Sequence, residues 1–161
     1  GGIVGCATAY YLAKLGGHKV RAIVVERNGV AAAASGTAAG FLAGGWGNHI
    51  TSELHERGFE LHQKLAAELA LRSHRTLPAW QVAAMAKQLG TQNGLPKDAP
   101  PWLDKCRVQA RLMDPGTAQV DPRELTEALM EAATAAGAQL RDGRAEGVRT
   151  ERTDNGCRVT G

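Results

Sequence analysis

The chain has 161 residues, of which 43% are hydrophobic, 22% are charged and only 4% are aromatic. This is the composition of a globular domain with a real core, and the low aromatic share predicts close packing of small side chains. The net charge of +3 is spread along the chain and no apolar run is long enough for a membrane span, so neither nucleic acid nor a membrane is predicted as a partner.

The three cysteines have no CxxC spacing, which argues against a zinc site or a disulfide framework and favours a reducing compartment. No metal site is predicted. Cys6 is predicted to be a packing residue and not a nucleophile.

The opening stretch GGIVGCATAYYLAKLGG predicts a glycine turn and a helix over residues 3–15 that ends at Gly16 and Gly17. The run KVRAIVVE follows and is typical of a strand buried on both faces in a parallel sheet. Residues 1–26 therefore predict the last two-thirds of a βαβ unit. Because both ends of the chain fall within predicted elements, we expect a fragment of a longer protein.

Residues 28–49 are rich in glycine and contain no Asp, Glu, Lys or Arg, which is typical of a segment that lines a site. Within it, the step at residues 34–37 is predicted to open a short helix with Ser35 as its cap. The next segment, residues 51–72, has leucines at helical spacing and predicts an amphipathic helix capped by Ser52.

The second half of the chain predicts strands and one clear helix. A strand is expected at residues 75–85, a Pro/Gly loop at 90–107, and one or two short strands at 108–121 with a turn at residues 114–116. Asp121 and Pro122 begin a helix that Gly137 ends. The tail predicts a strand and then a hairpin that turns at residues 154–156.

Two features of the N-terminal segment predict a dinucleotide site. Gly2 and Gly5 match the second and third glycines of a G-x-G-x-x-G fingerprint. Gly2 would let a pyrophosphate approach the backbone, and Gly5 would let the helix pack closely on its strand. Glu26 ends the predicted strand 21 residues after Gly5, where a carboxylate accepts hydrogen bonds from both ribose hydroxyls and repels the extra phosphate of NADP. The alternatives are a flexible helix start and a solvated charge at a strand end.

The pattern GGIVG…VVER…ASGTAAGFLAGGW resembles the FAD-dependent oxidoreductases of the D-amino acid oxidase (DAO) type, which include glycine- and sarcosine-oxidase-like enzymes. It is most similar to a subgroup of poorly characterised cytoplasmic members. The later stretch TAQVDPRELTEALMEAATAAGAQL is similar to the segment that re-enters the family's FAD domain. The resemblance covers essentially this whole chain, but only the N-terminal part of such proteins.

The resemblance implies an α/β fold: a Rossmann-type FAD/NAD(P)-binding domain with a truncated first strand, plus the first strands of an antiparallel substrate domain. The FAD-binding domain is expected at residues 1–74 and again at 119–161, with the start of the substrate domain at 75–118. FAD is the implied cofactor. A cytoplasmic location is implied by the subgroup.

The resemblance also carries over the family's cofactor contacts. The fingerprint and ribose positions are Gly2, Ile3, Gly5, Glu26 and Arg27. Ser35, Gly36 and Thr37 match the segment that wraps the pyrophosphate, and Gly40, Phe41 and Leu42 match the segment near the flavin ring. Ala145 stands at the backbone edge that holds the adenine, where the family usually has Val.

The implied reaction is oxidation of a C–N bond of an amine or amino acid by hydride transfer to the flavin. The substrate, the electron acceptor, the catalytic residues and the oligomeric state are left open. One alternative is an NAD-dependent dehydrogenase, which does not explain the glycine segment, and another is a non-catalytic FAD-binding interaction or trafficking protein. The chain alone is expected to be inactive and to bind FAD weakly or not at all, as an inert truncated product would.

Overall fold

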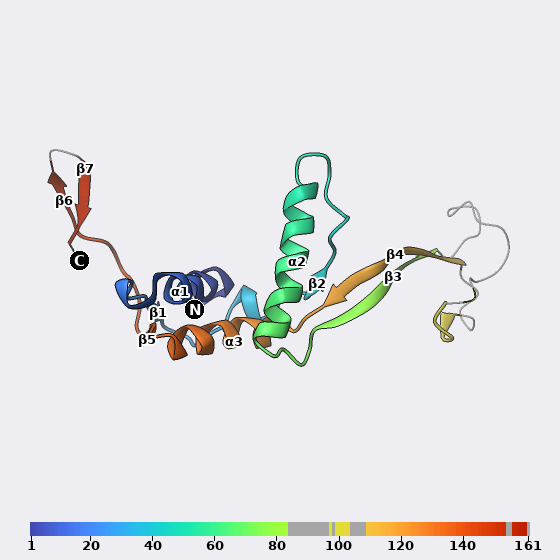
Figure 1. Ribbon diagram of the computed structural model, residues 1–161, viewed down its shortest axis with the longest axis horizontal. Helices are drawn as coiled ribbons and strands as arrows, with labels where there is room; N and C mark the ends of the chain where they lie inside the picture. Colours follow the sequence, from blue (N-terminus) through green and yellow to red (C-terminus); the bar gives the residue numbers. More distant parts are fainter. Residues whose placement is uncertain (84–96, 98, 104–108, 154–155, 161) are drawn as a thin grey trace. The chain divides into compact units, whose positions relative to one another are not determined.

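The structure is a computed structural model that describes residues 1–83, 97, 99–103, 109–153 and 156–160 (Figure 1). Most of the predicted loop at 90–107, and the turn residues Asp154 and Asn155, lie outside the described residues. The chain divides into two compact units, one formed by residues 1–38 with 122–161 and the other by residues 39–121.

The first unit is built on a parallel pair of strands, β1 (Ile23–Glu26) and β5 (Gln139–Asp142). Their register runs from Ile23 opposite Gln139 to Glu26 opposite Asp142, so both strands end at the same edge. Two helices, α1 (Ile3–Gly16) and α3 (Pro122–Ala135), lie side by side in this unit (Figure 1). Parallel strands combined with helices confirm the predicted α/β class.

The buried faces of the two helices combine small residues with a few large ones. The buried residues on α1 are Cys6, Ala9, Tyr10 and Ala13, and those on α3 are Leu125, Thr126, Leu129, Met130 and Ala133. Alanines at the contact let the helix backbones approach closely, as the low aromatic content predicts. Both predicted glycine stops are confirmed, because Gly17 and Gly137 follow their helices with φ angles of +51° and +101°.

The prediction that the strand in KVRAIVVE is buried on both faces was wrong for the described chain. In β1 only Val24 is buried, whereas Ile23 and Val25 are 44% and 47% exposed. Side chains alternate between the faces of a strand, so one face of β1 lies against the core and the other remains open.

The second unit contains an antiparallel sheet in the order β2-β4-β3, where β2 is Phe41–Leu42, β3 is Arg75–Ala83 and β4 is Gln109–Gln119. The predicted turn at residues 114–116 was wrong, because β4 is one continuous strand that pairs with β3. The register shifts next to Ala79, so the segment forms a bulge. Pro78 and Pro115 lie at this place and lack the N–H that a regular ladder needs, which explains the irregularity.

Helix α2 (Ser52–Glu68) begins and ends differently from the prediction. Its N-cap is Thr51, and Asn48 supports the start by accepting the backbone N–H groups of Ile50 and Thr51 at Oδ1. The helix stops before residue 72 because Ala70 takes a left-handed φ of +51°, a position that glycine usually fills. The sequence carries no glycine there to signal the stop.

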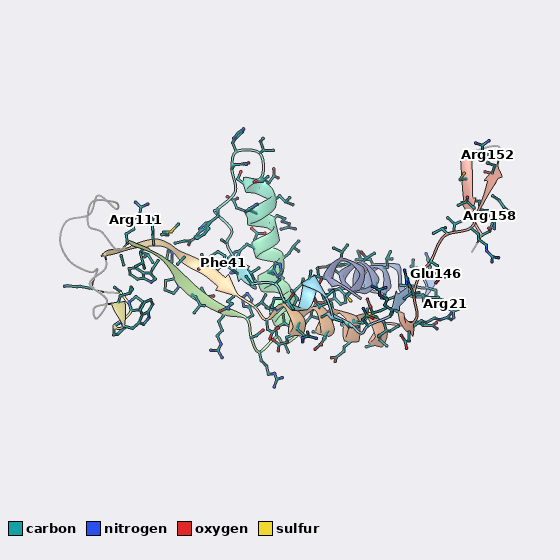
Figure 2. All side chains as sticks on the ribbon, turned by 180° about the vertical axis from the view of Figure 1, so that it is seen from behind. Arg21, Phe41, Arg111, Glu146, Arg152 and Arg158 are labelled. Atoms are coloured by element: carbon teal, nitrogen blue, oxygen red, sulfur yellow. The ribbon has the colours of Figure 1, made fainter. Side chains whose placement is uncertain are left out.

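The remaining hairpin pairs β6 (Thr150–Thr153) with β7 (Gly156–Val159), and all of its strand residues are exposed. Figure 2 shows Arg152 and Arg158, one from each of these strands. Within the described parts of the chain, no helix is both long and apolar enough to cross a membrane.

Candidate cofactor-binding site

The N-terminus of α1 is capped by a side chain from a distant part of the sequence. Gly2 is the N-cap residue and has no side chain to offer, so the backbone N–H of Ile3 donates to Ser35 Oγ over 2.9 Å. A Cβ on Gly2 would lie 3.1 Å from the same Oγ atom. Ser35 was predicted to cap a helix of its own. Instead it lies in a short 3₁₀ turn, η2 (Ala34–Gly36), and caps α1.

The loop that presents Ser35 is tightly folded at its base. Ala31 is fully buried with a left-handed φ of +57°, and its N–H donates to the carbonyl oxygen of Gly1 over 2.9 Å. A Cβ on Gly36 would overlap the carbonyl oxygen of Ala31. Only glycine therefore fits at position 36 without moving the backbone. Thr37 follows, and its N–H donates to the carbonyl oxygen of Ala34.

Glu26 is held at the end of β1 by backbone groups of the following residues. Its Oε1 atom accepts the N–H groups of Arg27 and Asn28, each over 2.8 Å, and its Oε2 atom lies 3.0 Å from the amino group of Gly1. These contacts, led by the N–H of Asn28, lower the pKa of Glu26 from 4.5 to about 2. The side chain is therefore a carboxylate at neutral pH, ready to accept further hydrogen bonds.

Two clefts share Glu26 as a common wall. A small cleft of about 50 Å³ has Gly1, Gly2, Glu26 and Ser35 among its lining residues. A second cleft of about 260 Å³ is lined by Val25, Glu26, Arg27, Gly143, Arg144 and Ala145.

The ends of β1 and β5 are joined at this place, because the N–H of Gly143 donates to the carbonyl oxygen of Glu26 over 2.9 Å. Gly2, Ser35, Arg27 and Ala145 thus line two clefts that share Glu26. Ile3 is joined to this group by its bond to Ser35, and Gly36 and Thr37 follow in the same loop.

Gly5 lies outside this group. It is exposed on α1, and apart from the backbone of its own helix and its two chain neighbours no described atom lies within 4 Å of the position of a Cβ there. The close helix–strand contact that the sequence predicted at Gly5 is therefore absent from the described residues. Helix α1 instead contacts α3, and its buried residues are Cys6, Ala9, Tyr10 and Ala13.

Gly40, Phe41 and Leu42 belong to the second unit and are described within it. Gly40 has a left-handed φ of +70°, and its carbonyl oxygen accepts the N–H of Val120 over 2.9 Å. Phe41, on β2, is 49% exposed, and its ring centroid lies 5.1 Å from that of Trp46 (Figure 2).

Sequence reasoning missed two residues of the site, Asn28 and Ala31. The pair Asn28-Gly29 is typical of a turn after the strand, but it does not predict the bond between the Asn28 N–H and Glu26. Ala31 carries no signal, because alanine rarely adopts a left-handed conformation and only the folded loop imposes it here.

The site combines groups of two chemical kinds. The N-terminus of α1 and the glycine backbone around it offer N–H groups and a positive dipole, which suit phosphate oxygens. The Glu26 carboxylate suits the two hydroxyls of a ribose. Among the described residues no three His, Cys, Asp or Glu side chains gather to hold a metal ion. This arrangement fits a nucleotide with a pyrophosphate.

The model of the family described as FAD dependent oxidoreductase (DAO) matches residues 1–161. Among solved structures, the glycine oxidase of Bacillus cereus ATCC 14579 aligns with a TM-score of 0.74 and 20% identity over 98% of this chain and 52% of its own. The glycine oxidase of Geobacillus kaustophilus aligns with a TM-score of 0.73 and 22% identity over 99% of this chain and 51% of its own.

The iminodiacetate oxidase of Chelativorans sp. BNC1 has a TM-score of 0.71 and 22% identity over 98% of this chain and 48% of its own. The chain therefore spans about half the length of the solved structures that it matches. At these identities, the likeness concerns the fold.

Proposed function

Because the chain belongs to the DAO family of FAD-dependent oxidoreductases, we propose that the two clefts sharing Glu26 bind the adenosine diphosphate half of FAD. One observation carries this proposal. The helix N-terminus at Ile3, the Ser35 hydroxyl and the ionised Glu26 carboxylate lie around a single glycine turn. These are the groups that recognise a pyrophosphate next to a ribose.

Each predicted contact has a role in this proposal. The backbone at Gly2, Ile3 and Gly5 and the loop at Ser35, Gly36 and Thr37 bind or shape the pyrophosphate site. Glu26 binds the ribose, and the cleft with Arg27 and Ala145 takes the adenine. Gly40, Phe41 and Leu42 approach the flavin ring. The FAD-binding domain comprises residues 1–74 and 119–161, and residues 75–118 begin the substrate domain.

The reaction that we propose for the whole protein is oxidation of a C–N bond in a small amine or amino acid. Bound FAD supplies the hydride acceptor for such a reaction. Support comes from the names of two similar proteins, a glycine oxidase and an iminodiacetate oxidase, whose named substrates both contain C–N bonds. If molecular oxygen is the second electron acceptor, the products are the imine and peroxide. We propose a cytoplasmic location, which the cysteine pattern favours.

Binding is tested by titrating FAD into the full-length natural protein and its Glu26→Ala variant by calorimetry. The variant is expected to bind FAD on the order of tenfold to a hundredfold more weakly, the scale of hydrogen bonds to a charged group. Asp142→Asn is the matched control, because Asp142 is the carboxylate opposite Glu26 in the strand register. Equal FAD affinity of Glu26→Ala and wild type would contradict the ribose role.

The reaction is tested by mixing the FAD-loaded full-length protein anaerobically with a panel of small amines and amino acids. Loss of the flavin absorbance near 450 nm identifies a substrate, and the imine product confirms that a C–N bond was oxidised. A flavin that stays oxidised with every compound would instead favour a non-catalytic role of bound FAD. Isolated residues 1–161, which span about half of the solved relatives, are expected to bind FAD more weakly than the full-length protein.

A further inference from the structure

Arg123, in the first turn of α3, reaches the base of the loop that presents Ser35. Its Nη2 atom lies 3.1 Å from the position that a Cβ of Gly36 would take. The carbonyl oxygen of Ala31 flanks the same position so closely that a Cβ would overlap it. The guanidinium therefore lies where the two ends of the loop meet, at Ala31 and Gly36.

The helix dipole does not favour an arginine at this place. A cation in the first turn of a helix is opposed by the helix dipole, which favours acidic residues there. Glu127 Oε1, one turn further along α3, lies 3.7 Å from Arg123 Nη1, and both side chains are about half exposed. An exposed pair of this kind contributes little to the free energy of folding. The position of the guanidinium beside the loop therefore indicates the role of Arg123 better than its pairing with Glu127 does.

We propose that Arg123 is a positioning residue for the loop formed by residues 31–37. Its planar guanidinium carries five N–H donors and holds the backbone at Ala31 and Gly36 together. This keeps Ser35 Oγ at the N-terminus of α1, where it accepts the N–H of Ile3. The consequence for cofactor binding rests on the proposed function, because the same loop is proposed to wrap the pyrophosphate of FAD.

The first test is amide hydrogen exchange in the full-length natural protein without FAD. Arg123→Gln is expected to raise the exchange rates of the Ile3 and Ala31 amides by about tenfold or more, because the loop that accepts or anchors them loosens. The Tyr10 amide, in the interior of α1, serves as the internal reference and should keep its rate. Unchanged exchange at Ile3 and Ala31 would overturn the proposal, whether or not the protein binds FAD.

The second test is the FAD dissociation constant of Arg123→Gln, which is expected to rise about tenfold. Arg57→Gln is the matched control, since Arg57 also pairs with a glutamate one turn away on a helix surface and should leave FAD binding unchanged. Arg123→Lys keeps the charge but not the planar fork, so it should recover only part of the affinity. Complete recovery by lysine would overturn the positioning role, whereas absence of FAD binding in the wild type would overturn only the proposed function.

Discussion

The backbone N–H of Ile3 donates a hydrogen bond to Ser35 Oγ over 2.9 Å, although 32 residues separate the two in the chain. Gly2 precedes the helix and has no side chain, so the start of α1 depends on this distant hydroxyl. The same bond draws the loop with Ser35 and Gly36 against the glycine turn. The proposed pyrophosphate site and the cap of the helix are therefore one structure.

Replacing Ser35 by alanine removes the acceptor for the Ile3 N–H. The free energy of unfolding is expected to fall by about 1 kcal/mol, the usual effect of losing a helix cap. Urea denaturation followed by circular dichroism measures it. Ser52→Ala is the control, because Thr51 and not Ser52 is the N-cap of α2. An equal loss of stability in both variants would show that the hydrogen bond from Ile3 to Ser35 does not stabilise the fold more than an ordinary serine contact.

Replacing Gly36 by alanine forces a Cβ onto the carbonyl oxygen of Ala31. We expect a destabilisation of about 1–3 kcal/mol, because the backbone itself has to move to remove the overlap. Gly58→Ala in the interior of α2 is the opposite case, since apart from its own helix backbone and its two chain neighbours no described atom lies within 4 Å of its added Cβ. That variant should gain roughly 0.5–1 kcal/mol from helix propensity. Thermal and urea unfolding of both variants would reveal the contrast, and a neutral Gly36→Ala would refute the tight loop.

The stability contribution of Glu26 should disappear in acid. Its pKa is lowered from 4.5 to about 2, chiefly by the backbone N–H of Asn28. A carboxyl with a lowered pKa stabilises the fold above pH 4.5, and this contribution is lost as the pH falls towards 2. The difference in unfolding free energy between wild type and Glu26→Gln should therefore shrink over that range. Glu146→Gln controls for loss of an exposed carboxylate, and a difference that stays constant with pH would contradict the lowered pKa.

Cys6 and Cys157 should differ in reactivity. Cys6, on α1, is fully buried, and burial raises the pKa of its thiol, so it stays protonated and shielded. Cys157 lies exposed on β7. Native protein treated with iodoacetamide at pH 8 should be modified at Cys157 and not at Cys6, as peptide mass spectrometry would measure. Rapid modification of Cys6 in folded protein would mean that its helix contact opens readily.

The local elements followed from the sequence where a short segment carries its own signal. The glycine stops at Gly17 and Gly137 and the helix that begins at Pro122 were predicted from spacing and turn residues. The stop of α2 at Ala70 and the bulge next to Ala79 were not. At these places the surrounding structure imposes a backbone conformation that the local residue types do not predict.

For the candidate site, the kinds of group that are present could be predicted from the sequence: a glycine turn, a helix start and a carboxylate at a strand end. How these groups meet follows from long-range contacts in the folded chain. The fold assigned Ser35 to the start of α1, placed Ala31 in a left-handed conformation beneath Gly36, and brought Arg123 from α3 to the same loop. The physical reason is that backbone donors and close contacts find partners by proximity in space, and sequence spacing predicts that proximity only within one helix, strand or turn.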